Sequence, residues 1–442
     1  MEIEDRPAPV PFAPADEAKV VVYRGAAVFD GTGAVLRSEA ALVVAGGNIR
    51  AVLDDADLSV ELLDSAEVVD LDGRVVIPGL IDSHQHLATP PNRPVAEGTL
   101  RRHVYSGVTA IRDMADDLRH IADLTRGTRV GEIAGPDIYY AALMAGPSFF
   151  DDPRTWQVSQ GETPGFVPWM QAITEETDLR IAVALARGTH ATAVKIYADL
   201  PGDLVAAISA EAHRQGLSVW AHAAVFPATP LEVVDAGVDV LSHVTMLGYQ
   251  LQSGSTLTYK GKEPLDPSTV SADDPRIGEV LDQMRQRNSI LDATASMWTR
   301  DELAHGDAAN VARAKANADL AAALTARAIR SGVDVCTGTD FETSSDDPFP
   351  SLYEELLFLN RRCGMAPDAV LRAATLVGAR SAGAESTMGT LEAGKLANFV
   401  VLDENPLADL ANLKSVSCTV KRGHRFPRSE YDAHLEMTSG GD

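Results

Sequence analysis

Cysteine is scarce in this 442-residue chain, which has only Cys336, Cys363 and Cys418, far apart in the sequence. An odd number of widely spaced cysteines gives no support for a disulfide framework, so we expect the protein to work in a reducing compartment. The chain also lacks an apolar run long enough to cross a bilayer, and its first residues lack the apolar segment of a secretory signal. We therefore expect a cytoplasmic protein with no membrane partner.

Positive charge is also in short supply. The 38 Lys and Arg residues face 63 Asp and Glu residues, which gives a formal net charge of −25. Because such an excess of negative charge is repelled by phosphate backbones and anionic lipids, it argues against nucleic acid or a membrane surface as a partner. We expect a small-molecule substrate instead, and self-association into a homo-oligomer.

Two nucleophile and nucleotide motifs are absent. No Gly-x-Ser-x-Gly segment is present that could form the nucleophile elbow of a serine hydrolase. The segment from Gly389 to Lys395 resembles a phosphate-binding loop, but Leu396 replaces the Ser or Thr that must follow the lysine. These absences argue against a serine hydrolase of that type and against a nucleotide-binding enzyme.

The residue pattern divides the chain into four regions. Residues 1–19 are rich in Pro and Ala and are expected to form a flexible arm, and residues 429–442 a C-terminal tail. Residues 20–74 and 385–428 contain short strand-like segments and turns, which we expect to combine into one small β-sandwich domain. Residues 75–384 alternate short apolar strands with amphipathic helices, a pattern typical of parallel β/α units.

Eight strands can be counted in this central region, and eight is the number found in a (β/α)8 TIM barrel. The expected strand ends lie at residues 84–86, 108–112, 138–143, 193–197, 218–222, 238–243, 290–294 and 333–340. Because the catalytic groups of such barrels lie at the carboxyl ends of the strands, these positions are where chemistry is expected.

Metal-ligating side chains occur at five of these strand ends. His84 and His86 follow the apolar run of residues 75–83 and, with the two-residue period of a strand, project to the same side. Two imidazoles on one face form half of a metal site. Lys195, His222 and His243 end later strands, and the last strand ends in Asp340. A hydrogen-bonded pair of surface histidines is the alternative for His84 and His86 alone, but the whole series favours a metal centre.

The order His-x-His, Lys, His, His, Asp resembles the amidohydrolase superfamily, and most closely its prolidase-like and imidazolonepropionase-like enzymes. The segments at residues 77–84, 107–113 and 389–395 extend the resemblance, which covers about residues 20–425. Asn398 departs from the family pattern, which has Asp there, at a position expected to lie in the β domain. Residues 222–227 and the loop after His243 are also less typical.

The resemblance implies a metal-dependent hydrolase. It implies that His84, His86 and Asp340 bind one Zn²⁺, that His222 and His243 bind a second, and that Lys195 is carboxylated and bridges them. Other divalent metals would suit the same ligands, and an unmodified Lys195 would leave only a mononuclear site. In this scheme a metal-bound hydroxide attacks the substrate and Asp340 transfers the proton to the leaving amine.

The substrate is the less determined part of the prediction. Long connections at residues 144–177 and 245–275 follow the third and sixth strands and are expected to shape the pocket. Tyr197, Tyr249, Trp298 and Arg300 are candidate substrate contacts, with Arg300 a possible carboxylate clamp or an ordinary surface arginine. We expect hydrolysis of an amide or peptide-like C–N bond, in an N-acyl amino acid or an Xaa-Pro dipeptide.

Several alternatives use the same site. They are hydrolysis of a carbamate, urea or cyclic amide, deamination, and ester or lactone hydrolysis. A catalytically inactive scaffold is the non-enzymatic alternative, and it predicts that ligands are missing, whereas all six are present.

Overall fold

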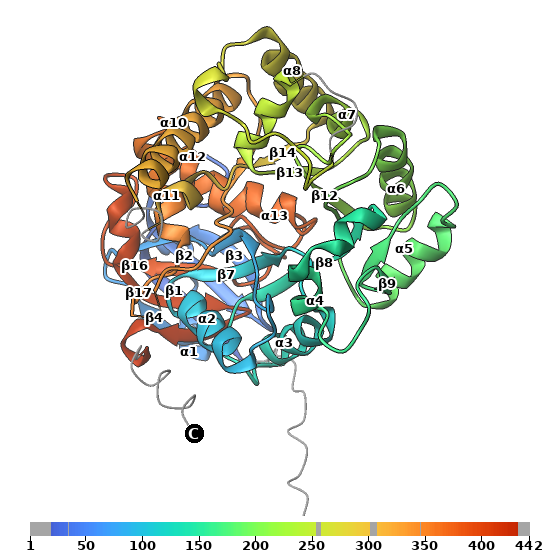
Figure 1. Ribbon diagram of the computed structural model, residues 1–442. Helices are drawn as coiled ribbons and strands as arrows, with labels where there is room; N and C mark the ends of the chain where they lie inside the picture. The colour runs from blue at the N-terminus through green and yellow to red at the C-terminus, as the bar shows by residue number, and fades with distance from the viewer. Residues whose placement is uncertain (1–18, 34, 253–257, 301–306, 345, 432–442) are drawn as a thin grey trace, which may run out of the picture.

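A nearly closed barrel of eight parallel strands forms the centre of the protein in a computed structural model that describes residues 19–33, 35–252, 258–300, 307–344 and 346–431 (Figure 1). Most of the expected N-terminal arm and C-terminal tail therefore lies outside the described residues. The barrel strands are β6 (Leu80–Gln85), β7 (Val108–Asp113), β8 (Asp137–Ala145), β11 (Ala193–Ile196), β12 (Ser218–His222), β13 (Val240–Ser242), β14 (Ile290–Asp292) and β15 (Val335–Cys336). The predicted TIM barrel is confirmed.

Helices cover the outside of the barrel and complete its β/α units. Their apolar faces pack on the strands, as in α5, where Ala182, Val183 and Ala186 are buried. The helices are α2 (Arg93–Tyr105), α3 (Leu118–Val130), α4 (Pro153–Val158), α5 (Leu179–Gly188), α6 (Gly202–Arg214), α7 (Pro230–Asp235), α8 (Pro275–Arg287), α10 (Ala308–Arg330), α11 (Leu352–Arg361), α12 (Pro367–Arg372) and α13 (Gly378–Ser381). No helix in the described parts of the chain has the length and apolar character needed to cross a bilayer.

Two backbone hydrogen bonds connect the first barrel strand, β6, with the residues that follow the last strand, β15. The backbone N–H of Ser83 donates to the carbonyl of Thr337 over 2.7 Å, and that of Asp340 donates to the carbonyl of His84 over 3.0 Å. The first and last strand ends are thereby held side by side. Residues more than 250 positions apart in sequence thus meet at one edge of the barrel.

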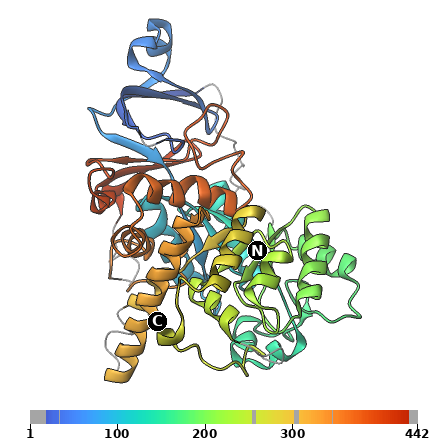
Figure 2. The same ribbon diagram turned by 90° about the horizontal axis from the view of Figure 1, so that it is seen from above.

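A second sheet, built from both ends of the chain, lies beside the barrel (Figure 2). It contains β1 (Val20–Val28), β2 (Arg37–Ala45), β3 (Asn48–Asp54), β4 (Glu67–Asp70), β5 (Val75–Pro78), β16 (Phe399–Leu402), β17 (Val416–Lys421) and β18 (His424–Pro427), with α1 (Val60–Ser65) between β3 and β4. Strand β1 is irregular between Tyr23 and Ala26, and its two halves pair with β4 and β5 respectively. The two parts of the sheet enclose a common apolar core, in which the rings of Tyr23 and Phe399 meet edge to face at 5.0 Å.

The small sheet is connected directly to the strand that carries His84. Strand β5 pairs with β16 and passes through Gly79 into β6. Gly79 has no room for a side chain, since a Cβ there would lie 2.1 Å from Oγ1 of Thr109. Its backbone N–H donates to the carbonyl of Asn398 over 3.0 Å. Asn398, the departure from the family pattern, therefore lies directly before β16, next to the small sheet.

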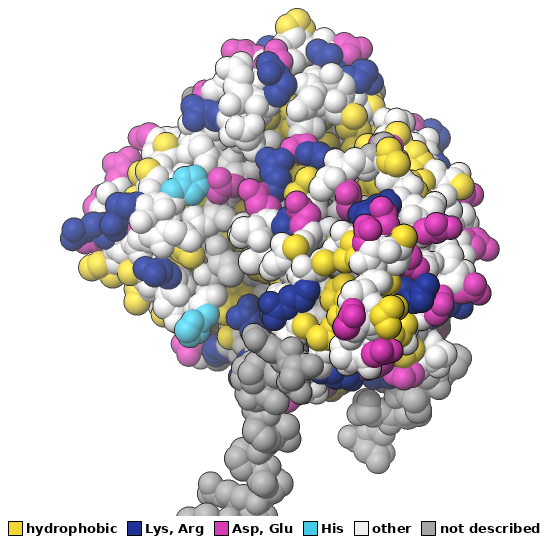
Figure 3. All heavy atoms as spheres, turned by 180° about the vertical axis from the view of Figure 1, so that it is seen from behind, with side chains coloured by type: hydrophobic (Ala, Val, Ile, Leu, Met, Phe, Trp, Pro, Cys, Tyr) yellow, Lys and Arg dark blue, Asp and Glu magenta, His cyan; other side chains and the backbone are white. Residues whose placement is uncertain are grey.

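The surface carries charges of both signs. On the face opposite that of Figure 1, Lys and Arg side chains are interspersed among Asp and Glu (Figure 3). Elsewhere on the described surface, opposite charges also meet in ion pairs such as Arg126 with Glu132 and Arg214 with Glu211. Exposed pairs of this kind add little to stability, because solvent screens them.

Candidate active site

The six side chains predicted from the strand ends come together at one end of the barrel. The rings of His84 and His243 have their centres 5.0 Å apart, and those of His222 and His243 4.9 Å apart. Asp340 lies among the imidazoles, with Oδ1 3.5 Å from Nε2 of His84 and 3.4 Å from Nε2 of His86, and Oδ2 3.8 Å from Nδ1 of His243. We call these six residues the histidine cluster, namely His84, His86, Lys195, His222, His243 and Asp340.

Three members of this cluster offer ligand atoms to a single point. One ligand atom from each of His84, His86 and Asp340 lies within 4.8 Å of the other two, an arrangement that could hold a metal ion. His84 is buried, whereas 32% of the His86 side chain is exposed toward the open end of the barrel. The site is therefore open to solvent on the side of His86.

Carboxylates behind the first two histidines fix their orientation. Nδ1 of His84 lies 2.7 Å from Oδ2 of Asp292, and Nδ1 of His86 lies 2.7 Å from Oδ1 of Asp116. Because the Nδ1 of each imidazole is hydrogen-bonded to a carboxylate, the Nε2 of each remains available as a metal ligand at the centre of the cluster. Burial would lower the pKa of His86, but the charges of Asp116 and Asp340 outweigh it and raise that pKa well above the ordinary value.

Lys195 is buried in the barrel wall next to this network. Its Nζ donates to Oγ of Ser242 over 3.1 Å, and Ser242 donates to Asp292 over 2.9 Å. Burial lowers the pKa of Lys195 to about 7, and the nearby guanidinium of Arg112 adds to this effect. A substantial fraction of this amine is therefore neutral near pH 7.

His222 and His243 complete the cluster from β12 and the end of β13. Burial is the main cause that lowers the pKa of His243 to about 3 and that of His222 well below its ordinary value, so both imidazoles are neutral at pH 7. Nδ1 of His222 is buried and has no hydrogen-bond partner among the described residues. An uncompensated nitrogen of this kind is an available metal ligand.

The backbone is left-handed at two of these positions. His243 has φ of 71° and Asp340 has φ of 60°, conformations that cost non-glycine residues on the order of 1 kcal/mol or more. Hydrogen bonds hold both in place, since N–H of His243 donates to the carbonyl of Asp292 and N–H of Asp340 to that of His84. The surrounding strands therefore determine where these side chains point.

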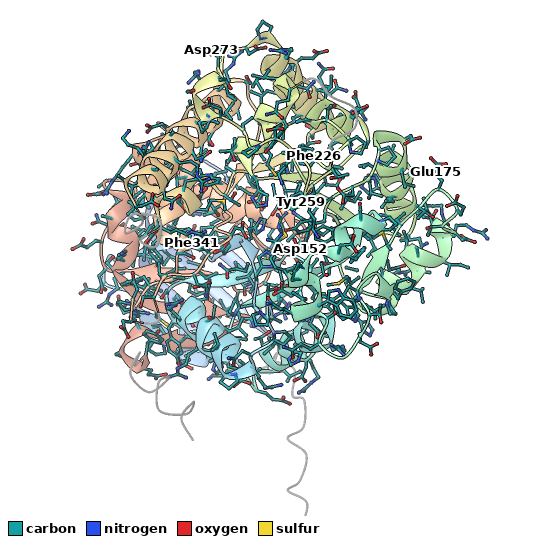
Figure 4. The ribbon with its side chains drawn as sticks, in the orientation of Figure 1. Asp152, Glu175, Phe226, Tyr259, Asp273 and Phe341 are labelled. Atoms are coloured by element: carbon teal, nitrogen blue, oxygen red, sulfur yellow. The ribbon has the colours of Figure 1, made fainter. Side chains whose placement is uncertain are left out.

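A cavity of about 690 Å³ opens over the cluster. The connections after the third and sixth strands both contribute to its wall, as their lengths suggested. Phe149, Met170 and Tyr259 come from these connections, and Tyr259 lies near the middle of the molecule together with Phe226 (Figure 4). The rings of Tyr259 and His222 stack with their centres 5.9 Å apart. The aromatic wall thus reaches the histidine cluster.

Three of the four predicted substrate contacts line this cavity, namely Tyr197, Tyr249 and Trp298. Arg300 is described but is not among the side chains that line it. The predicted role of Arg300 as a carboxylate clamp therefore has no support in the geometry.

The sequence analysis missed four residues that shape the site. Asp292 lies at a predicted strand end but was not singled out, because a lone carboxylate there also suits a turn. Asp116 lies in a loop 30 residues after His86, where nothing in the sequence links the two. Tyr259 and Lys262 belong to a long connection without periodic pattern, so no sequence signal separates them from their neighbours.

Comparisons with known proteins agree with this architecture. Residues 75–426 match the amidohydrolase family. The imidazolonepropionase of Solibacter usitatus (strain Ellin6076) is 24% identical over 386 residues, which cover 84% of this chain and 86% of that protein. Among solved structures, A. niger ochratoxinase superposes with a TM-score of 0.73 at 23% identity, covering 95% of this chain and 98% of that one. A Xaa-Pro dipeptidase with bound methionine superposes with a TM-score of 0.71 at 19% identity, covering 92% and 100%.

The family match spans most of the chain, including all eight barrel strands and the six residues of the histidine cluster. The chain therefore belongs to the amidohydrolase family, and it is a hydrolytic enzyme that acts on carbon–nitrogen bonds.

Proposed function

We propose that the protein is a zinc-dependent amidohydrolase that cleaves an amide or peptide-like C–N bond in an N-acyl amino acid or an Xaa-Pro dipeptide. The observation that carries this proposal is the histidine cluster, in which His84, His86 and Asp340 can share one ion beneath a cavity of substrate size. The Xaa-Pro dipeptidase that shares this fold suggests the dipeptide alternative.

The residues present fit two metal ions. His84, His86 and Asp340 would hold the first, and His222 and His243 would hold the second, for which the unpartnered Nδ1 of His222 is available. Lys195 would bridge them as a carbamate, and the lowered pKa of its amine favours the neutral form that carbon dioxide needs. When bound, such ions would lower the pKa of water to about 7 and polarise the substrate carbonyl.

Asp340 is the group that would move the proton. Although burial raises its pKa, the imidazoles of His84 and His243 outweigh this and hold the pKa well below the ordinary value. The carboxylate is therefore ionised at neutral pH and can accept a proton from the attacking water. It would return that proton to the nitrogen of the leaving amine as the new C–O bond forms and the C–N bond breaks.

The orientation of the ligands would come from the carboxylates behind them. Asp292 keeps Nε2 of His84 directed at the centre of the cluster, and Asp116 does the same for His86. Tyr197 would close one side of the reaction space, since its ring packs 4.0 Å from that of His222. The aromatic wall would also limit the entry of water.

The test combines metal analysis with a substrate panel. We expect about two zinc ions per chain, loss of hydrolysis on chelation and recovery when zinc is added. The panel contains N-acyl amino acids and Xaa-Pro dipeptides, with carbamates, ureas, cyclic amides and lactones as the other classes this site could serve. His222→Asn should lose metal and activity, whereas His213→Asn, a half-exposed histidine at the opposite end of the barrel, should keep both.

Three results would contradict all or part of the proposal. Hydrolysis that survives complete removal of metal would exclude the assigned chemistry. A fully metal-loaded protein that cleaves no member of the panel would favour the inactive scaffold. Preferential cleavage of lactones or ureas would be compatible with the proposed metal centre but would contradict the proposed substrate class.

A further inference from the structure

The wall of the cavity carries positive charge in a chain that is strongly acidic overall. Three cationic side chains line it, Arg154, Lys262 and Arg313, although the net charge of the chain is −25. The two carboxylates that line it, Asp116 and Asp340, both contact histidines of the cluster. Among the lining residues that the structure describes, the wall beyond the cluster therefore has cations and no acids. A cavity of this charge favours an anionic ligand.

Lys262 differs from the other two cations in its surroundings. Arg154 has a carboxylate partner, with Nη2 2.8 Å from Oδ2 of Asp152, and Arg313 is exposed on α10. Lys262 is half-buried, and no carboxylate of the described residues lies within ion-pair distance of its ammonium group. Its charge is thus the least compensated of the three.

The contacts of Lys262 leave part of its ammonium group free. Nζ donates to the carbonyl of Tyr259 over 2.5 Å and lies 3.6 Å from the centre of the Tyr259 ring. Asp199 is near, but its two carboxylate oxygens accept from the N–H of Tyr259 and from Oγ of Ser148. Burial, with a contribution from Arg154, lowers the pKa of Lys262, which means that its charged form is disfavoured in the cavity wall. A bound anion would stabilise this charged form.

Tyr259 sets the distance between this lysine and the histidine cluster. One aromatic ring contacts both groups, since Tyr259 stacks with His222 and receives the ammonium of Lys262. The ammonium group of Lys262 is therefore separated from the proposed metal ligand His222 by the ring of Tyr259. A ligand that spans the two points needs an anionic group a few bonds away from its reacting carbonyl, as in an N-acyl amino acid.

We propose that Lys262 binds the carboxylate of the substrate and so makes the enzyme selective for acidic amides. This inference rests on the proposed function and assigns to Lys262 the carboxylate contact that sequence analysis offered as one of two alternatives for Arg300. The carboxylate pairs with the ammonium at the Tyr259 ring, and the apolar wall, including Phe149 and Met170, receives the uncharged part of the substrate. Neutral amides of the same shape lack this contact.

The test uses one N-acyl amino acid that the enzyme cleaves and the carboxamide of the same compound. The wild-type enzyme should prefer the acid. In Lys262→Gln the KM for the acid should rise roughly 10- to 100-fold, the effect of losing a hydrogen bond to a charged group, while kcat and the KM for the carboxamide stay within a factor of three. Lys262→Arg should keep part of the preference, and Lys260→Gln, an exposed lysine of the same segment, should behave as wild type.

Binding to the metal-free protein separates this inference from the proposed function. Calorimetry should show that the same acid binds more weakly to metal-free Lys262→Gln than to metal-free wild type, whether or not the loaded enzyme hydrolyses it. Equal affinity of the two proteins, or equal use of acid and carboxamide by the wild type, would overturn the role of Lys262. Absence of all hydrolysis together with the expected loss of binding would overturn only the proposed reaction.

Discussion

Asp292 and His84 form a buried pair, with Oδ2 of the carboxylate 2.7 Å from Nδ1 of the imidazole. Neither side chain has appreciable contact with solvent. Two further groups hold the same carboxylate oxygen, since Oγ of Ser242 donates to it over 2.9 Å and Nη2 of Arg112 lies 3.3 Å away. Arg112 in turn packs 4.4 Å from the centre of the Trp220 ring. The orientation of His84 therefore depends on a network that reaches across the barrel interior.

Replacing Asp292 with Asn should weaken metal binding. The amide is neutral and can present its NH₂ group to Nδ1, so it no longer fixes the imidazole with Nε2 free, and we expect metal affinity to fall about 10- to 100-fold. Competition with a chelator measures the change. Asp239→Asn, a carboxylate that contacts His213 at the opposite end of the barrel, is the control and should retain wild-type affinity. Unchanged affinity in Asp292→Asn would refute the positioning role.

The metal-free protein should become more stable when Lys195 is replaced with Met. Burial lowers the pKa of Lys195 to about 7 in the folded state, against 10.5 ordinarily. Below pH 7 both states are protonated and the folded state bears the full cost of a buried ammonium. Between pH 7 and 10.5 the unfolded chain binds more protons, so wild-type stability rises with pH through this window.

The variant should therefore exceed the metal-free wild type by ~4 kcal/mol near pH 7, with a difference that shrinks toward pH 10. Urea unfolding at a series of pH values measures this. Lys260→Met removes an exposed lysine and should show no such pH dependence. If the metal-free wild type is more stable than metal-free Lys195→Met at pH 7, the expected cost of burying the amine is wrong.

A side chain at Gly338 should disturb the site. A Cβ at this position would lie 2.0 Å from Oδ1 of Asp292 and 2.7 Å from Cβ of His84, so Gly338→Ala must displace one of them. We expect ~1–3 kcal/mol of destabilisation and a reduced metal content, measured by thermal unfolding and elemental analysis. Gly188→Ala, where nothing lies within 4 Å of the added Cβ, should keep the metal. Full metal content in Gly338→Ala would show that the barrel end can adapt.

Arg300→Gln should leave substrate affinity nearly unchanged. Since Arg300 does not line the cavity, KM should change by no more than about twofold, as for substitutions away from a functional site. Steady-state kinetics with an N-acyl amino acid measure this. A large rise in KM would instead support the carboxylate clamp, one of the two alternatives that sequence analysis left open for Arg300.

The sequence predicted the fold and the histidine cluster for a common physical reason. In a parallel barrel all strands end at the same edge, so His84, Lys195 and Asp340 could be brought together without knowledge of any distance. Partners in loops follow no such rule. The contact between His86 and Asp116, and the presence of Lys262 but not Arg300 in the cavity wall, depend on how long connections fold. The sequences of these connections carry no periodic pattern that predicts their fold.

The pairing of β5 with β16 has a consequence for how the chain is made. Strand β5 leads through Gly79 into the strand that carries His84, yet its antiparallel neighbour is synthesised some 320 residues later. A nascent chain on the ribosome must therefore wait with this edge open until Phe399–Leu402 emerges. Translation of the C-terminal segment, and not completion of the barrel alone, therefore sets the moment at which β5, the strand that leads into the first ligand strand, is paired on both sides.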